Sequence, residues 1–574
     1  MKVKTESEML PVKQEYTNGQ TDSTESTSLL SAPHPDFSNP SINYSSMATA
    51  ATMPLTSTPD TISWTSAFLR MNWLAIPMLL QYTFSFFIFV LSYFLNRLGA
   101  EEDNPNYHDA YPSIAFMLNS VILLVFAALS TIGNLICKKI SGPDTEETRQ
   151  DITRFFKNGV RFSVVAAAVT AIPLVFSEEI FRATDLDPGV AAIAGTFLRL
   201  YSPVLIFLYL RGVLEQLMFS FQKQFYAMII GIISFSIGVF LALGLGFGDF
   251  SMPNWGLDGL IFAFGAEAVI FFTLLAIYVG IDQTFKPYKF YESLFSIFFI
   301  DQNEWAQIKE LFQYGWKITF TVLMEILALL AMNSIIGAIG GDALDAWSFA
   351  SQLLFLALIV IYAYATAGLQ EIERTFNTPN IASRVAWSGL LANILPILIM
   401  CAVLTAYPEI LMLYSADVSE EVMKMVYILM LLTSGIVILD MLRYHFIFGL
   451  RAHDDYNKPA IIFTSCLWGG VVLAALAGLL APSPLNIYGV VSSWLLSLFI
   501  TDISLAHRVY ETLNFLATSH PLIEASAPAT LSHLEAASPE LDSANQDPTS
   551  DDFTSPRARF CPDPMTGMNY ILNL

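Results

Sequence analysis

Residues 318–333 read ITFTVLMEILALLAMN, an apolar run whose one ionisable residue is Glu325. Crossing about 30 Å of hydrocarbon takes roughly 20 predominantly apolar residues in a helix. Runs of that length recur from about Ser66 to His507, and we count about twelve of them. Lipid offers the backbone no hydrogen-bond partners, so a span must be a helix or part of a closed barrel, and continuous apolar runs lack the alternation of barrel strands. The sequence therefore predicts an all-α, polytopic membrane protein.

The composition agrees with this class and excludes several others. Hydrophobic residues make up 54% of the chain and charged residues 14%. The net charge of −22 gives no support for nucleic-acid binding. The four cysteines lack metal-ligand spacing, and the chain has no GxxxxGK[ST] phosphate loop. We therefore expect no enzyme activity, no metal and no cofactor, and any transport would have to be secondary.

The chain divides into five parts by composition. Residues 1–65 and 509–574 are rich in Ser, Thr and Pro, and such segments bury too little apolar surface to offset their ordering entropy, so we predict disordered cytoplasmic tails. An N-lobe of six helices (66–281) and a C-lobe of six helices (312–508) flank an interfacial connector (282–311) that mixes charge with aromatic rings. The helices are expected near 66–95, 112–137, 158–178, 189–210, 217–248, 256–281, 316–340, 344–369, 384–406, 422–449, 459–480 and 486–506.

Loop charge predicts the topology. Lys and Arg accumulate in the connections after even-numbered helices, as at Lys138 and Lys139, whereas connections after odd-numbered helices are acidic, as at Glu101 and Glu102. Short basic loops stay in the cytoplasm, so both termini are predicted to be cytoplasmic. The first apolar run follows a long polar leader, which is unlike a cleavable signal peptide. We expect an integral multi-pass protein, with a bacterial cell (inner) membrane as the first choice.

A weak internal repeat links the two lobes. The stretch LRGVLEQLMFSFQK (210–223) aligns without gaps on LDMLRYHFIFGLRA (439–452). Many transporters are built from such repeats, with the substrate site between them. The repeat supports two six-helix lobes in the same orientation.

Three carboxylates lie inside apolar runs, away from helix ends: Glu325, Asp440 and Glu267. An ionisable group at membrane depth is costly, and a transporter can use it to exchange a proton or hold a cation. The alternative is a structural group that is hydrogen-bonded across a helix interface. We favour function for Glu325 and Asp440, which share one lobe, and leave both interpretations open for Glu267. We expect anchoring or loop pairing, not substrate binding, for a further group at helix ends: Arg211, Glu215, Arg443, His445 and Arg451.

Two stretches resemble the multidrug and toxic compound extrusion (MATE) family of the MOP flippase superfamily. GWKITFTVLMEI (315–326) is similar to the family's helix 7, and LDMLRYHFIFGLRAHDDYNKP (439–459) is similar to its helix 10. The resemblance extends over roughly Trp64 to Arg508. It implies that Glu325 and Asp440 are the acidic pair that couples H⁺ or Na⁺ entry to drug release by alternating access.

The resemblance also has departures. Ser92 stands where many bacterial members place an acidic residue in helix 1, and the predicted helix 5 contains no Asn, although members with an N-lobe cation site usually have one there. The coupling site is therefore expected in the C-lobe. Glu267, Asn333 and Ser92 are kept as secondary site candidates.

The sequence thus predicts a secondary transporter that exports organic cations or related small molecules by antiport with H⁺ or Na⁺. Its partners would be a cationic small molecule and the lipid bilayer, and we expect a monomer. Two alternatives remain. One is a lipid-linked substrate flippase of the same superfamily, although such proteins tend to line their cleft with basic groups. The other is a transport-derived membrane scaffold whose tails recruit partners.

Overall fold

The computed structural model describes residues 63–526 apart from the gaps 86–87, 185, 301, 376–378, 413–418 and 483–484. Within this part every regular element is a helix, and no strand occurs. Eleven helices are long and apolar enough to cross a membrane. The prediction of an all-α, polytopic membrane protein is confirmed. Most of the two predicted tails lies outside the described residues.

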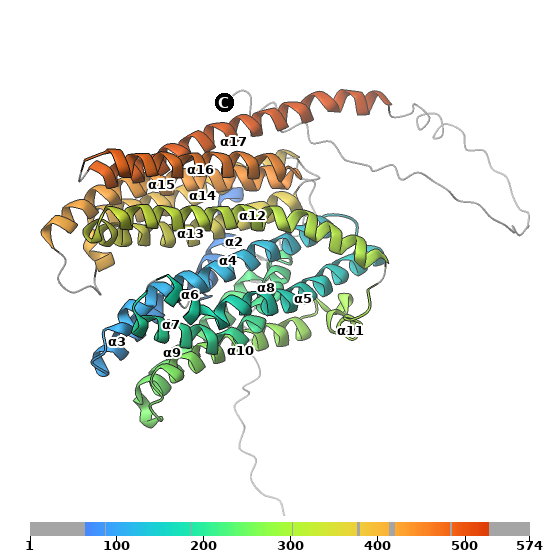
Figure 1. The fold of residues 1–574 in the computed structure, drawn as a ribbon. Helices are drawn as coiled ribbons and strands as arrows, with labels where there is room; N and C mark the ends of the chain where they lie inside the picture. The colour runs from blue at the N-terminus through green and yellow to red at the C-terminus, as the bar shows by residue number, and fades with distance from the viewer. Residues whose placement is uncertain are drawn as a thin grey trace, which may run out of the picture. The chain divides into compact units, whose positions relative to one another are not determined.

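The helices follow the predicted order (Figure 1). The N-lobe contains α2 (Trp64–Ser85), α3 (Ile88–Glu101), α4 (Asn106–Ile140), α5 (Glu146–Val175), α6 (Ser177–Ala183), α7 (Pro188–Tyr201), α8 (Leu205–Ser220), α9 (Gln224–Phe247) and α10 (Leu257–Ile281). The short helix α11 (Phe290–Leu294) follows. The C-lobe contains α12 (Gln302–Ile339), α13 (Gly341–Arg374), α14 (Pro379–Ala406), α15 (Glu420–Ala452), α16 (Asn457–Leu480) and α17 (Leu485–Ser526).

Polar side chains fix several helix starts. Asp187 precedes Pro188, and its Oδ1 accepts hydrogen bonds from the backbone N–H groups of Gly189 and Val190 at the start of α7. Ser419 accepts in the same way from Val422 at the start of α15. Such caps satisfy N–H groups that have no partner within the helix. They place helix starts next to the predicted apolar runs.

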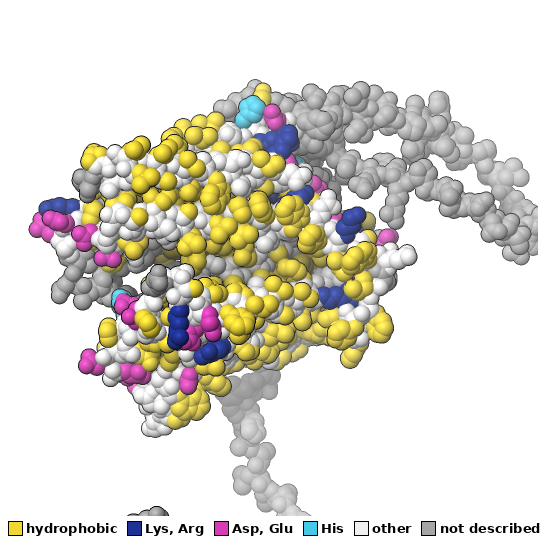
Figure 2. All heavy atoms as spheres, viewed as in Figure 1, with side chains coloured by type: hydrophobic (Ala, Val, Ile, Leu, Met, Phe, Trp, Pro, Cys, Tyr) yellow, Lys and Arg dark blue, Asp and Glu magenta, His cyan; other side chains and the backbone are white. Residues whose placement is uncertain are grey.

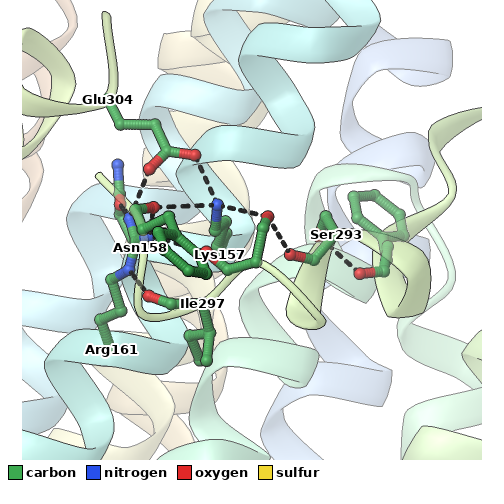
Figure 3. Close-up of polar contacts among 9 residues, drawn as sticks. Lys157, Asn158, Arg161, Ser293, Ile297 and Glu304 are labelled. Carbon is green, nitrogen blue, oxygen red and sulfur yellow. Dashed lines mark hydrogen bonds and ion pairs between the residues drawn. The ribbon is translucent and has the colours of Figure 1, made fainter. Parts of the chain in front are cut away.

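Two helices extend into segments that we predicted as connector and tail. α12 begins at Gln302, inside the predicted connector 282–311, and α17 continues to Ser526, inside the predicted tail. One of the charges in that stretch, Glu304, belongs to a cluster with α5, since it pairs with Lys157 at 2.6 Å and with Arg161 at 2.9 Å (Figure 3).

The cluster also holds the chain before α12. Arg161 donates to the carbonyl oxygens of Ile297 and Phe299, both at 2.6 Å, and Lys157 donates to the Ser296 hydroxyl at 2.8 Å. These contacts fix the connector backbone, while the Phe295 and Phe298 side chains are 89% and 93% exposed. The contacts with α5 therefore hold the stretch Ser296–Phe299, while the rings of Phe295 and Phe298 face outward.

The two lobes have separate hydrophobic cores that meet at one end. We call this the closed end, where α12 begins and α4 and α13 finish. Three C-lobe helices show the same change along their length. In α13 the buried residues up to Ala357 pack in the C-lobe core, and those from Ala363 onward pack in the N-lobe core. In α14, Val385 joins the N-lobe core and Ile397 the C-lobe core, and in α15 Phe448 joins the N-lobe core.

The cores therefore fuse at the closed end and are distinct toward the opposite end. The elements that bridge them are α2, which packs against α13 and α14, and α12, which packs against α4. Figure 2 shows hydrophobic side chains covering the flanks of the visible helices, with many charged side chains at their ends. This distribution suits a bilayer around the flanks.

The closest approach of α9 and α10 gives a stability prediction. A Cβ on Gly259 would lie 2.1 Å from the carbonyl oxygen of Leu245, so Gly259→Ala must push backbone apart. Overpacking of this kind costs about 1–3 kcal/mol. We expect a lower midpoint of thermal unfolding in detergent. Gly469→Ala in α16 is the matched control, because no atom lies within 4 Å of the added Cβ. Equal midpoints for the two variants would contradict the predicted packing.

Candidate functional site

The candidate site is a buried cluster of charges in the C-lobe. Nη2 of Arg443, on α15, lies 2.7 Å from Oε1 of Glu325 on α12 and 3.0 Å from Oδ1 of Asp440 on its own helix. The guanidinium also packs over the rings of Tyr444 and Phe463, 4.5 Å and 4.2 Å from their centroids. The structure thus brings the two carboxylates predicted from the sequence to one arginine.

Burial decides how these charges behave. Arg443 is 1% exposed and Asp440 is 3% exposed, whereas the Glu325 side chain retains 21%. Burying a charge without a partner costs several kcal/mol, so the arginine stabilises carboxylates that lipid could not accommodate. Glu325 is the most accessible member of the three.

A third carboxylate belongs to the same region and was missed in the sequence. Asp502 on α17 is 6% exposed, and neither of its oxygens has a hydrogen-bond partner among the described residues. The charged groups that act on it are Arg443, by attraction, and Asp440, by repulsion. The sequence shows this Asp inside the apolar run SSWLLSLFITDISLA (492–506). We did not select it because it lies close to the end of the predicted helix 486–506.

The N-lobe holds a smaller cluster of similar design. Nε of Arg211 on α8 lies 2.6 Å from Oε1 of Glu215, and its Nη1 lies 3.8 Å from Oε1 of Glu267 on α10. The guanidinium packs over the ring of Phe271 at 4.0 Å. Glu267, kept open from the sequence, is therefore buried and faces an arginine. α8 and α15 are the helices that contain the two stretches of the internal repeat.

The expected anchoring role is wrong for the arginines of both clusters. Arg211 and Arg443 were predicted to anchor at the membrane interface or to pair with loops, but both are buried and face carboxylates on helices. Arg451 is also buried, over the ring of Phe448 at 5.0 Å. We predicted anchoring only from the position of these arginines near helix ends. That position does not reveal which side of the helix faces protein.

The other secondary candidates lie apart from these contacts. Asn333 accepts a hydrogen bond from Nε1 of Trp347 at 2.7 Å, which ties α12 to α13. Ser92 lies on α3, a helix with no carboxylate before Glu101. Among the described residues, no group of three or more His, Cys, Asp or Glu side chains is arranged to hold a metal ion.

Polar contacts join the lobes at the closed end. Nη2 of Arg70 on α2 lies 2.6 Å from Oε1 of Glu371 on α13, and Gln222 donates to the other oxygen of that carboxylate at 3.2 Å. Lys138, at the end of α4, pairs with Asp454 after α15 at 2.5 Å. Since each pair connects the two lobes, separating the lobes at this end requires these pairs to break.

No family model matches the chain. Curated relatives are nevertheless found among the probable multidrug resistance proteins NorM. The protein of Mesorhizobium japonicum is 21% identical over 273 residues, which cover 47% of this chain and 57% of that protein. The protein of Agrobacterium fabrum is 26% identical over 201 residues, which cover 34% of this chain and 41% of that protein. The chain thus matches only about half the length of these relatives.

Solved structures agree over much more of the chain. The crystal structure of the eukaryotic MATE transporter AtDTX14 matches with a TM-score of 0.64 at 15% identity, over 78% of this chain and 96% of that one. The chain has the fold of the solved MATE transporters. A second MATE family transporter, a multidrug resistance protein of the MOP superfamily in an outward-facing conformation, matches with a TM-score of 0.65 at 13% identity. It covers 77% of this chain and 94% of that one.

The charge cluster of the C-lobe gives a second stability prediction. Arg443→Met leaves Asp440 and Glu325 buried without their cation, and removing one partner of a buried pair costs about 3–5 kcal/mol. We expect a clearly lower midpoint of thermal unfolding, which Asp440→Asn recovers in part. The control is Arg149→Met, which removes an exposed partner of Asp144. An unchanged midpoint for Arg443→Met would show that the cluster does not stabilise the lobe.

Proposed function

We propose that this protein is a secondary transporter that exports cationic small molecules in exchange for H⁺ or Na⁺. The observation that carries the proposal is the buried cluster of Glu325, Asp440 and Arg443 inside a membrane-spanning MATE fold. Buried carboxylates of this kind bind a proton or cation readily, and an ion-coupled exporter needs such a group. The NorM relatives carry the name of multidrug resistance proteins, which agrees with an efflux role.

The coupling would use competition at the acidic residues. Glu325, the most exposed member, receives the incoming ion, and Arg443 holds Asp440 in place behind it. An incoming cation neutralises carboxylates that would otherwise attract the substrate, so ion binding favours substrate release. At low dielectric the attraction between a cationic substrate and an acidic site is strong, which selects this substrate class.

Alternating access would use the geometry of the closed end. The Arg70–Glu371 and Lys138–Asp454 pairs keep the lobes together there, while the lobe cores are distinct toward the opposite end. A change of access then breaks these pairs and forms new contacts at the other end. The loop charges support a cytoplasmic closed end, with both termini on that side of a bacterial cell membrane, and we propose a monomeric transporter.

The connector supports the same orientation. Its outward aromatic side chains Phe295 and Phe298 suit the boundary between lipid and water, where aromatic rings accumulate. The Lys157–Arg161–Glu304 cluster fixes it against α5. We propose that the connector lies along the cytoplasmic surface of the bilayer.

A lipid-linked flippase is the second candidate, but the buried charges favour it less. The buried arginines of both clusters, Arg211 and Arg443, are each engaged by carboxylates, which leaves less positive charge for an anionic headgroup. A non-transporting scaffold would have no use for a buried acidic cluster that costs stability.

Vesicle transport tests the proposal. We expect purified protein in proteoliposomes to move ethidium against its gradient when a pH or sodium gradient is imposed. Glu325→Gln and Asp440→Asn remove the charge that binds the ion, so each should lower the gradient-driven rate roughly tenfold or more. Asp144→Asn, in the loop before α5, is the control and should transport like wild type. Gradient-driven transport at wild-type rates in both cluster variants would refute the site assignment.

A further inference from the structure

The C-lobe cluster contains more negative than positive charge. Glu325, Asp440 and Asp502 are three carboxylates around one guanidinium, that of Arg443. Glu325 and Asp440 both pair with the same atom of this arginine, Nη2. When all three carboxylates are ionised, the cluster therefore carries two uncompensated negative charges.

Asp502 is the member without direct compensation. It is 6% exposed, and both of its oxygens lack a hydrogen-bond partner within the described part of the chain. α17 packs against α15, α16 and α12. On these helices the ionisable groups of the cluster are Asp440 and Arg443 of α15 and Glu325 of α12. The apolar part of α16, from Ala460 to Leu480, contains no charged residue.

A buried carboxylate in this position has to be neutralised. An ionised, unpaired carboxylate in a low-dielectric interior is so unfavourable that it takes up a proton or a cation. Of the two, a proton can bind a single carboxylate without any further ligand. The geometry therefore indicates protonation at more than one place in the cluster.

We propose that Asp502 is a third proton-binding residue of the C-lobe and that the cluster takes up two protons in each transport cycle. This inference rests on the proposed antiport function. The proton balance follows directly: two protons bind to carboxylates from one side, and both leave to the other side after the lobes change access. Arg443 stays charged throughout. If the exported substrate carries one positive charge, each cycle moves one net positive charge inward.

A proton count on the purified protein tests this without any substrate. The measurement is potentiometric titration of detergent-solubilised protein from pH 9 to pH 5 in sodium-free buffer. We expect Asp502→Asn to take up about one proton fewer than wild type, because an exposed carboxylate is already ionised across this window and a neutralised buried one is not. Equal proton uptake by wild type and Asp502→Asn would overturn the proposal.

The control is Glu511→Gln, which removes the same charge from the exposed part of the same helix and should leave the proton count unchanged. Thermal unfolding separates proton binding from a purely structural role. A structural carboxylate would lower the unfolding midpoint when replaced, whereas removing an unpaired buried charge should keep or raise it. If Asp502→Asn does not remain monodisperse, Asp502→Ser removes the same carboxylate for the same titration.

Transport gives the second measurement. In proteoliposomes with a potassium diffusion potential, we expect wild-type ethidium export to accelerate when the potential draws positive charge inward. Asp502→Asn should still respond to a pH gradient but lose most of this dependence on potential, since its exchange becomes one proton for one substrate. Unchanged dependence in the variant, or none in wild type, would contradict the two-proton cycle.

The two measurements also separate the inference from the proposed function. If wild type does not move ethidium at all, the proposed export of this cation fails, and the proton count still decides the role of Asp502. If Glu325→Gln abolishes transport but Asp502→Asn matches wild type in both measurements, antiport stands and the third proton site is refuted.

Discussion

The cost of placing charge inside a membrane is the constraint on which this structure depends. The C-lobe offsets it by bringing Glu325 and Asp440 to within 2.7 and 3.0 Å of the Arg443 guanidinium, and the N-lobe by pairing Arg211 with Glu215. Such pairs do not add stability over an apolar core, but breaking them is expensive. Their retention inside apolar helices is therefore an argument for function and for a defined helix arrangement.

The arrangement of the cores links this chemistry to motion. α13 contributes to the C-lobe core as far as Ile361 and to the N-lobe core from Ile359, so one continuous helix belongs to both lobes. α15, which carries Asp440 and Arg443, also reaches the N-lobe core at its end through Phe448. A change in the charge of the cluster therefore acts on a helix that is packed against the opposite lobe at the closed end.

Much of the fold could be predicted because apolar runs and caps are local features. Each predicted range contains an observed helix, but 66–95 covers α2 and α3, and 189–210 covers α7 and part of α8. The other errors fall at ends, since α5 and α12 begin earlier and α17 finishes later than predicted. The misplaced ends of α12 and α17 contain charged or polar residues whose contact partners lie far away in the sequence. Glu304 indicates a connector until its pairing with Lys157 of α5 is known.

The sequence by itself determined the membrane class and the order of the helices, and it singled out Glu325 and Asp440 as carboxylates inside apolar runs, because hydrophobic length and an isolated carboxylate can be recognised in a linear chain. Only the tertiary structure showed that Arg443 joins these two residues and that Asp502, buried near them, has no hydrogen-bond partner among the described residues. The physical reason is that charge compensation depends on distances between side chains on different helices. Those distances are set by helix rotation and packing, which the periodicity of uniformly apolar helices does not specify.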